Sequence, residues 1–348
     1  MAKNKIGKLL IAAALLSSLT WIAHTKYNQH LMRHLSDTIT LESPQLGAGA
    51  HLLLPNLSDA RVVAPDRPHD PIEVQAEDRF KRIQRLRSFL VTTNSLGYRS
   101  PELDSSSKIR IVAIGDSVTF GWGVAYEDSY PAILEELLNQ KGSSTEVVNV
   151  GVPAMKPRHM AKWAELNLKE LRPDLVLVAR RPDWMEPNPL NNYRDALNRI
   201  QRSAGQAQVG LILPPISSFD VKGRSMAKYE LEEISKRWKG PLLDLTATFE
   251  QKKGTSGVDL KLVAGEQILI DRTSNSELVR CKSPPDIPGT PSLCAEIVST
   301  FESDSSIKEP LFFDGGHPDK EGFAHFAKAV LSWINSEQLL KNPLPNKQ

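Results

Sequence analysis

The sequence predicts an α/β fold built on a parallel β-sheet that helices cover on both faces. Between residues 109 and 245, short and predominantly apolar segments alternate with longer amphipathic ones. Strands buried on both faces are apolar, and their alternation with helices is typical of parallel sheets. A chain of 348 residues with 40% hydrophobic content can also bury the large core that such a fold needs.

The predicted elements follow one another in a regular order. The strands span residues 109–114, 146–150, 175–179, 209–213 and 242–245. The helices span residues 129–139, 158–171, 193–203, 227–238 and 320–334, and the last of these closes the domain. The strand segments are short and rich in Val, Ile and Leu, whereas the helical segments place their apolar residues on one face. No internal repeat is visible.

The N-terminus carries an export signal. Basic residues are followed by an almost wholly apolar run from Leu9 to Ala23. This run is longer than most cleavable signal cores and shorter than a segment that comfortably spans a bilayer. Because Trp21, Ile22 and His24 leave no good small-x-small cleavage site, we interpret residues 1–25 as an uncleaved signal anchor. A cleaved signal peptide and a buried helix of a cytosolic protein are the alternatives. The chain would then be anchored in the inner membrane of the cell envelope, with the domain facing the periplasm or the outside.

Two parts of the chain depart from the alternation. Residues 26–91 are polar and rich in proline, which predicts a tether or an irregular arm, with a short basic helix over residues 79–90. Residues 92–340 form the main domain, and residues 249–310 are interpreted as an insertion within it. Loops of that length are usually functional or disordered.

The two cysteines, Cys281 and Cys294, lie in this insertion. In an oxidising compartment they would close a short loop as a disulfide. A Cys/His metal site is the competing interpretation, but no second pair of ligands has the spacing typical of a zinc site. The disulfide is therefore favoured on the condition that the chain is exported, and no metal is expected.

The charge balance argues against nucleic acid as a partner. The formal net charge is +2, and no dense basic stripe with interleaved aromatic residues occurs. Nucleic-acid-binding domains carry such a stripe or patch. Nothing in the sequence calls for a cofactor either.

The first candidate for chemistry is the tripeptide GDS at residues 115–117, directly after the first predicted strand. Open α/β sheets bind their ligands at this edge. Ser117 could serve there as a nucleophile. Alternatively, Asp116 and Ser117 cap backbone N–H groups in an ordinary turn.

The second candidate is the pair Asp314 and His317, just before the closing helix. A carboxylate at this spacing can accept a hydrogen bond from one imidazole nitrogen and leave the other facing a hydroxyl. The Asp then fixes the tautomer while the His takes the proton. His325 lies in the closing helix and is assigned to the surface or to packing. A metal site is not indicated either. The spacing of His317, His325, Asp314 and Asp319 does not place two metal ligands on one face of a helix.

Three segments together resemble the SGNH (GDSL-type) hydrolase family. The sequence VAIGDSVTFG at residues 112–121 resembles the first block of the family, and NVGVP at 149–153 resembles the second. The sequence FDGGHP at 313–318, with Gly322, resembles the last, and the turn at 94–99 is similar to one in envelope-anchored members. The resemblance covers about residues 92–335. It implies a three-layer α/β/α sandwich with a flavodoxin-like parallel sheet.

The resemblance implies acyl transfer through a serine. Ser117 would be the nucleophile, His317 the general base, and Asp314 the residue that orients it. The N–H groups of Ser117 and Gly151 would face the developing oxyanion, where one such donor contributes about 2.7 to 4 kcal/mol. An ordinary α/β-hydrolase has the same order of residues but needs Gly-x-Ser-x-Gly and an Asp far from the His. Neither is present.

The third block departs from the family pattern. Where the family has a Gly and then an Asn after the third strand, this chain has the sequence ARRPDW at residues 179–184. Asp183 stands where the Asn would donate to the oxyanion, and an ionised carboxylate cannot donate. Three explanations stay open: Asp183 is protonated, Arg180 or Arg181 contacts the substrate and assists the backbone donors, or the site is inactive. The alternative to a role of Arg180 or Arg181 in the site is that both side chains are solvent-exposed charges of the loop.

The implied function is that of an exported serine esterase or O-acyltransferase. It would act on O-acyl groups, acetyl above all, of an envelope carbohydrate through an acyl-serine intermediate. Its partners would be an acylated small molecule or polysaccharide and, through the N-terminal segment, the membrane. The sequence does not separate hydrolase from transferase, because the two differ only in whether water or a sugar hydroxyl takes the acyl group. A non-catalytic SGNH-fold binding or assembly protein of the envelope is the alternative, which the altered third block favours.

Overall fold

The fold is described from a computed structural model of the chain. The structure describes residues 39–65, 86–140, 142–184, 186–216, 221–253, 258–263, 266–271, 276–282, 311–312 and 316–340. The predicted signal segment at residues 1–25 lies outside these ranges. Among the helices of the described ranges, none combines the length and the apolar character that crossing a membrane requires.

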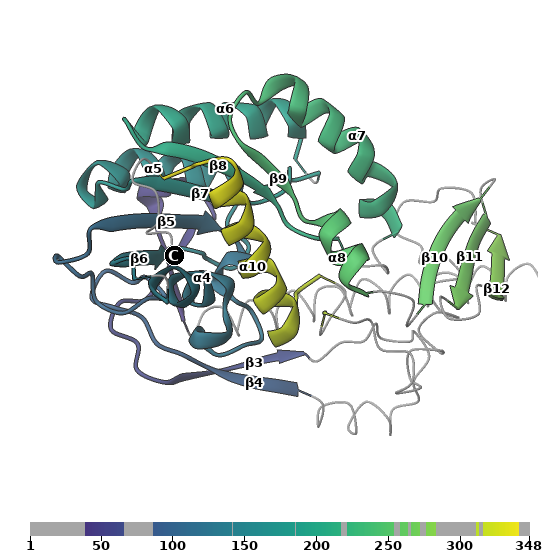
Figure 1. The fold of residues 1–348 in the computed structure, drawn as a ribbon, viewed down its shortest axis with the longest axis horizontal. Coiled ribbons are helices and arrows are strands. Elements are labelled where there is room, and N and C mark those ends of the chain that lie inside the picture. The colour runs from purple at the N-terminus through teal and green to yellow at the C-terminus, as the bar shows by residue number, and fades with distance from the viewer. Residues whose placement is uncertain are drawn as a thin grey trace, which may run out of the picture.

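A five-stranded parallel sheet forms the centre of the domain (Figure 1). Its strands lie in the order β6-β5-β7-β8-β9. Their bounds are β5 (Ile109–Gly115), β6 (Thr145–Asn149), β7 (Leu175–Ala179), β8 (Gln208–Leu213) and β9 (Leu242–Asp244). This is the flavodoxin-like order, in which the chain reverses direction across the sheet after its second strand. The predicted fold class and sheet type are therefore confirmed.

Helices cover both faces of the sheet, which gives three layers (Figure 1). One face carries α4 (Tyr130–Asn139), α8 (Thr246–Lys253) and α10 (Lys320–Ser336). The other carries α5 (Pro157–Leu171), α6 (Pro189–Ser203) and α7 (Val221–Arg237). Successive side chains of β5 point to opposite faces, so Ile111 joins the core under α4 and α10, while Val112 joins the core under α5 and α6. Burial of the sheet on both faces explains why its strands are apolar throughout.

The predicted arm packs against the domain through short antiparallel strands. These are β1 (Thr40–Glu42), β2 (His51–Leu53), β3 (Ala60–Pro65) and β4 (Leu86–Val91), with a 3₁₀ turn η1 (Pro44–Leu46). Ile39, Leu53 and Val62 lie in the same buried cluster as the α5 face of the sheet. The described part of residues 26–91 is thus an ordered addition to the core.

The basic helix predicted for residues 79–90 is wrong over the residues that the structure describes. Residues 86–91 form β4, which pairs antiparallel with β3. Phe89 and Val91 are buried, whereas Leu90 between them is 52% exposed. Buried and exposed side chains thus alternate with a period of two, as in a strand that has one buried and one solvent-exposed face. The run of basic residues obscured this alternation.

The predicted insertion contains a three-stranded antiparallel sheet. Its strands are β10 (Val258–Val263), β11 (Glu266–Asp271) and β12 (Ser276–Lys282). Cys281 lies in β12, and Cys294 lies outside the described residues. The disulfide between them remains a prediction.

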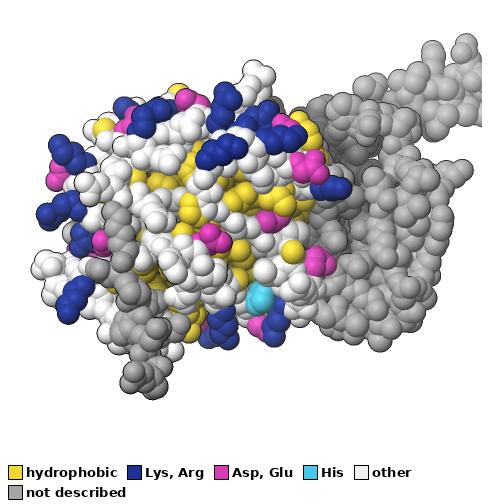
Figure 2. Space-filling view, turned by 45° about the horizontal axis from the view of Figure 1, so that its top comes forward, with side chains coloured by type: hydrophobic (Ala, Val, Ile, Leu, Met, Phe, Trp, Pro, Cys, Tyr) yellow, Lys and Arg dark blue, Asp and Glu magenta, His cyan; other side chains and the backbone are white. Residues whose placement is uncertain are grey.

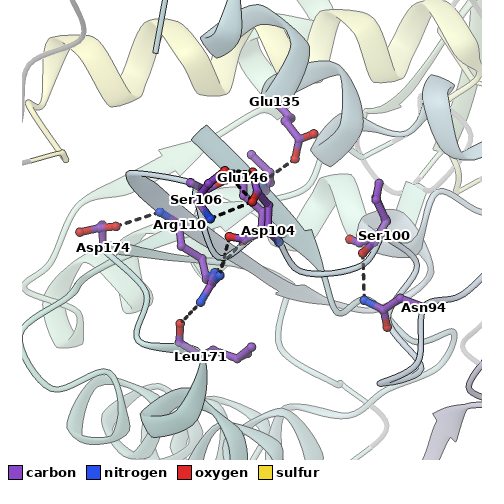
Figure 3. Close-up of polar contacts among 12 residues, drawn as sticks. Asn94, Ser100, Asp104, Ser106, Arg110, Glu135, Glu146, Leu171 and Asp174 are labelled. Carbon is purple, nitrogen blue, oxygen red and sulfur yellow. Dashed lines mark hydrogen bonds and ion pairs between the residues drawn. The ribbon is translucent and has the colours of Figure 1, made fainter. Parts of the chain in front are cut away.

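A polar network holds the edge of the sheet at which β5 begins (Figure 3). Arg110 Nε contacts Glu146 Oε2 at 2.7 Å, and its Nη1 donates to the carbonyl of Leu171 at 2.8 Å. Asp174 Oδ2 accepts from the Arg110 backbone N–H at 2.8 Å. These contacts join β5, β6 and the end of α5 at the side away from the GDS motif. The opposite edge, where β5 ends, is left to the candidate site.

Apolar side chains gather across the middle of one face of the molecule (Figure 2). Lys and Arg lie mainly around them, whereas some Asp and Glu side chains lie among them. Tyr193, Leu197 and Trp238 line a small, mainly apolar groove between α6 and α7. The Tyr193 hydroxyl donates to the carbonyl of Arg180, directly after β7, at 2.6 Å.

Candidate active site

The GDS motif forms the turn between β5 and a four-residue helix, α3 (Ser117–Phe120). Asp116 is the N-cap of this helix, and its Oδ1 accepts from the Val118 N–H at 3.0 Å. Gly115 makes the tight turn feasible, because a Cβ there would lie 2.7 Å from the carbonyl oxygen of Ala179 on β7. Ser117 is therefore the first residue of α3, at the carboxyl edge of the sheet.

Ser117 and His317 meet although 200 residues separate them. His317 Nε2 lies 2.8 Å from Ser117 Oγ, which is hydrogen-bond distance. An imidazole nitrogen at this distance can take the hydroxyl proton as the oxygen attacks a carbonyl carbon. The structure thus brings together the two groups that the sequence analysis assigned to nucleophile and base.

The segment that carries His317 is fixed at both of its ends. Phe312 and Pro318 form an antiparallel bridge, and the Asp319 N–H donates to the carbonyl of Leu311 at 2.9 Å. Asp319 also caps α10 through the Gly322 N–H at 2.8 Å. Gly322 permits this packing, because a Cβ there would overlap the carbonyl oxygen of Leu311. Asp314 lies outside the described residues, so its predicted contact with His317 stays a prediction.

A tryptophan neighbours the imidazole. The rings of Trp122 and His317 have centroids 6.4 Å apart, at an interplanar angle of 40°. Trp122 is buried and also packs on Phe89 and Phe120. An apolar wall therefore lies beside the Ser117–His317 pair. Nothing in the sequence pattern marks Trp122, although it follows the first block directly.

The Gly151 N–H, the second expected oxyanion donor, has a hydrogen-bond acceptor within its own loop. It donates to Asn149 Oδ1 at 3.0 Å. A Cβ at Gly151 would lie 2.7 Å from the carbonyl carbon of Thr119 and 2.9 Å from Phe120 Cα. The glycine thus allows the loop after β6 to pack against the backbone of α3. In this structure its N–H is engaged by an internal acceptor instead of being open toward a substrate.

The loop continues into a strained turn that the sequence analysis missed. The Met155 N–H donates to the carbonyl of Val152 at 3.0 Å, so residues 152–155 form a β-turn. Ala154, its third residue, has a φ of 61°, in the left-handed region that favours glycine. Pro153 before it is typical of a type II turn, which requires a positive φ at that place. The Val152 N–H in turn donates to the carbonyl of Gly115 at 3.2 Å, which ties this turn to the GDS motif.

Asp183 lies in a cluster of charges and contacts a cation. Its Oδ2 is 3.5 Å from Lys156 Nζ, and the Asp183 side chain is only 13% exposed. Lys156 also lies 3.5 Å from Glu186, which contacts Arg158. A carboxylate that faces an ammonium group acts as an acceptor and has no proton to donate. The structure thus places Asp183 beside Lys156, in a cluster that also contains Glu186 and Arg158.

Arg181 belongs to a structural network. Its guanidinium contacts Glu230 Oε1 at 2.7 Å, Asp244 Oδ1 at 3.0 Å and Thr246 Oγ1 at 2.8 Å. Its Nε donates to the carbonyl of Pro214 at 2.7 Å. These partners join the ends of β7, β8 and β9 to α7, so the expectation of a substrate-binding or solvated Arg181 is not met. Sequence spacing gave no signal for the buried Glu230, which lies far along the chain.

Arg180 contacts the GDS motif itself. Its Nη1 lies 2.6 Å from Asp116 Oδ2, and the side chains of Arg180 and Asp116 are 23% and 11% exposed. This is a partly buried ion pair, not a solvated loop charge. It places a cation beside the turn that presents Ser117.

Buried Arg99 contacts the other end of α3. Its guanidinium donates to the carbonyls of Phe120 at 2.7 Å, Gly121 at 2.8 Å and Val124 at 2.8 Å. It also reaches the carbonyl of Leu90 on β4 at 3.2 Å. Arg99 ends the turn at residues 94–99 that the family resemblance includes, so this turn is attached directly to the helix that carries Ser117.

No metal centre is found within the described ranges. They contain no group of three or more His, Cys, Asp or Glu side chains arranged to hold an ion.

Comparison with known proteins gives one family and several solved structures. Residues 113–258 match the GDSL-like Lipase/Acylhydrolase family. A lipase/acylhydrolase from Enterococcus faecalis is 17% identical over 69% of this chain and 100% of its own, with a TM-score of 0.43. An acetyl xylan esterase is 14% identical over 65% of this chain and 100% of its own, with a TM-score of 0.41. A two-domain esterase active on acetylated mannans is 13% identical over 69% of this chain and 51% of its own, with a TM-score of 0.39. No curated protein matches the chain.

Proposed function

We infer that this chain, which belongs to the GDSL-like lipase/acylhydrolase family of ester-cleaving serine hydrolases, uses Ser117 as its nucleophile and His317 as its general base. One observation carries the proposal: Ser117 Oγ and His317 Nε2 lie 2.8 Å apart at the carboxyl edge of the parallel sheet. Open α/β sheets bind their ligands at this edge. Asp314, three residues before His317, is proposed to orient the imidazole.

The reaction would proceed in two halves. In the first, Ser117 Oγ bonds to the ester carbonyl carbon and gives its proton to His317 Nε2. The bond to the alcohol then breaks, and the alcohol leaves with that proton. In the second half, a water molecule or a sugar hydroxyl attacks the acyl carbon and gives its proton to His317. Ser117 Oγ leaves with this proton, and a carboxylic acid or a new ester is released.

Stabilisation of the oxyanion would depend first on the Ser117 N–H. This group belongs to the first turn of α3, where backbone N–H groups have no partner within the helix. The Gly151 N–H could contribute only by giving up its bond to Asn149 Oδ1. Each oxyanion donor lowers the reaction barrier by about 2.7 to 4 kcal/mol. If the Gly151 N–H does not contribute, we therefore expect slower turnover.

We further propose that the enzyme is exported and acts on O-acyl groups, such as acetyl, of an envelope carbohydrate. The basic N-terminus and the apolar run at residues 9–23 support export to the cell envelope. Hydrolase and acyltransferase are both compatible with an acyl-serine intermediate. Supplying acylated polysaccharide with and without a second sugar acceptor, and measuring free acid against transferred acyl groups, would separate them.

Labelling with a fluorophosphonate tests the proposal, because only an activated serine reacts. We expect the full chain to be labelled at Ser117 and to hydrolyse a small aryl acetate. Ser117→Ala and His317→Ala should each lose turnover while keeping the fold, as judged by circular dichroism. Turnover by Ser117→Ala at the wild-type rate would exclude Ser117 as the nucleophile.

The contact of Asp183 with Lys156 and the engaged Gly151 N–H favour a second candidate, a non-catalytic binding or assembly protein on the same fold. A folded wild-type chain that is inert both to esters and to fluorophosphonate would favour this candidate over the enzyme.

A further inference from the structure

The ion pair between Arg180 and Asp116 lies next to the proposed nucleophile. Asp116 immediately precedes Ser117, and its two carboxylate oxygens have different partners. Oδ1 accepts from the Val118 N–H at 3.0 Å and caps α3, while Oδ2 lies 2.6 Å from Arg180 Nη1. The capping interaction needs only an acceptor oxygen, which an amide would also supply. The charge of the carboxylate therefore requires a separate explanation.

A negative charge at this position opposes the reaction proposed above. Ester attack by Ser117 places a new negative charge on the former carbonyl oxygen. An uncompensated Asp116 carboxylate, within about one residue length of Ser117, would repel that charge across a partly buried site. The cation of Arg180 cancels this repulsion.

Arg180 is held in place by both neighbouring strands and by a buried tyrosine. Its N–H donates to the carbonyl of Ile212 on β8 at 3.1 Å. Its carbonyl accepts from the Tyr193 hydroxyl at 2.6 Å. The preceding Ala179 is paired with Gly115 across the sheet, so the two ends of the ion pair start from adjacent strands. The guanidinium is thereby directed to the N-terminal end of α3.

We propose that Arg180 is an electrostatic positioning residue for the reaction at Ser117: it neutralises Asp116, so that Asp116 can cap α3 without opposing the oxyanion. The proposal rests on the function proposed above and assigns to Arg180 a role through Asp116, not through the substrate. Arg181 next to it provides a matched comparison, because it has the same side chain in the same loop but pairs with Glu230 and Asp244.

A double-mutant cycle tests this inference. Four proteins are compared: wild type, Arg180→Gln, Asp116→Asn and the double variant. Turnover of a small neutral aryl acetate is measured per active site, which is counted with fluorophosphonate, and thermal stability is measured alongside. We expect Arg180→Gln to lower kcat about ten-fold or more, because it leaves the Asp116 charge uncompensated. The double variant should recover at least five-fold over Arg180→Gln, because Asn keeps the cap and removes the charge.

Two further variants separate charge from structure. Arg180→Lys keeps the cation and should keep most of the turnover. Asp116→Asn should change the kcat of Arg181→Gln only by the factor by which it changes the wild-type kcat, because Arg181 pairs with Glu230 and Asp244 and not with Asp116. If Arg180→Gln does not fold, Asp116→Asn decides alone: the inference expects its kcat to rise, since a cation is then left beside the oxyanion, and the absence of a rise overturns it.

Each other outcome is equally decisive. A loss in Arg180→Gln that Asp116→Asn does not recover would mean that Arg180 acts on the substrate directly, and the inference would fall. A lower melting temperature with unchanged kcat would reduce Arg180 to a structural residue, with the same consequence. A wild type that turns over no ester would remove the proposed function and this inference together, whereas an active wild type with a failed cycle would remove the inference alone.

Discussion

Replacing Gly151 by alanine would place a methyl group against the backbone of the helix that carries Ser117. The added Cβ would lie 2.7 Å from the carbonyl carbon of Thr119 and 2.9 Å from Phe120 Cα, and nearer still to the Phe120 nitrogen. Cβ atoms essentially never approach other atoms within 3.0 Å, so one of the two segments must move by at least a few tenths of an ångström. Neither side can yield by rotating a side chain, because all three crowded atoms belong to the backbone.

The size of the effect follows from the place of the collision. A displacement of 1 Å in a reacting group can cost about 100-fold in rate, so we expect Gly151→Ala to lower kcat by about ten- to 100-fold. Overpacking of this kind typically costs about 1 to 3 kcal/mol of stability as well. The assay is hydrolysis of an aryl acetate below the melting temperature, normalised to the folded fraction.

Gly205→Ala is the matched control for this substitution. Gly205 has a φ of 64°, but a Cβ there would meet nothing within 4 Å. Its substitution should cost about 1 kcal/mol of backbone strain and leave kcat unchanged. A folded Gly151→Ala protein with the wild-type kcat would refute the reasoning that this contact positions α3.

Three other substitutions or conditions have expected outcomes. Ala154→Gly should raise the free energy of unfolding by up to about 1 kcal/mol in urea denaturation, because a φ of 61° strains alanine; a destabilised variant would contradict this. Burial, together with nearby Arg158 and Lys156, lowers the pKa of His159 from 6.5 to about 4, so the unfolded chain binds a proton there before the folded chain does. Stability should therefore fall by at most about 3 kcal/mol as pH falls from 6.5 to 4, and His159→Phe should flatten this slope. Asp183→Asn should raise the turnover of small esters up to about ten-fold if residue 183 faces the oxyanion, since an amide can donate there; an unchanged rate would place it elsewhere.

The sheet was predictable from the sequence because burial on both faces leaves a simple signal. The segment at 175–179 was predicted with the same bounds as the observed β7, and the other sheet strands differ by one residue at either end. The GDS motif and His317 were also found, because the family resemblance identifies them by residue type and order. Their contact at 2.8 Å is a consequence of topology: β5 is an interior strand of the sheet, and the segment before α10 brings His317 back to the end of β5 from the far end of the chain.

Other parts of the site could not be predicted because they depend on contacts between distant residues. Whether the Gly151 N–H is free depends on the rotamer of Asn149, which the sequence does not specify. The two adjacent arginines look alike in the sequence, yet Arg180 reaches the neighbouring strand β5 while Arg181 reaches β9 and α7. Strand β4 was missed because basic residues gave the segment a helical appearance, whereas its pairing with β3 decides its structure.

The described part of the predicted arm is also connected to the chemistry. Arg99 is fully buried, and burial lowers its pKa to about 10, so its guanidinium is still charged at neutral pH. The guanidinium donates to carbonyl groups at the C-terminal end of α3, where the helix dipole is negative, and lies 4.4 Å from the centroid of the Phe120 ring.

Arg99 also connects β4 to this helix. Its guanidinium donates to the carbonyl of Leu90 on β4, and Phe89 of that strand packs on Trp122, which neighbours His317. The helix that carries Ser117 is thus held at its N-terminal end from β7 and at its C-terminal end from β4. Residues 86–91 accordingly form part of the surroundings of the proposed nucleophile, and a boundary drawn at residue 92 would divide them from the helix that they support.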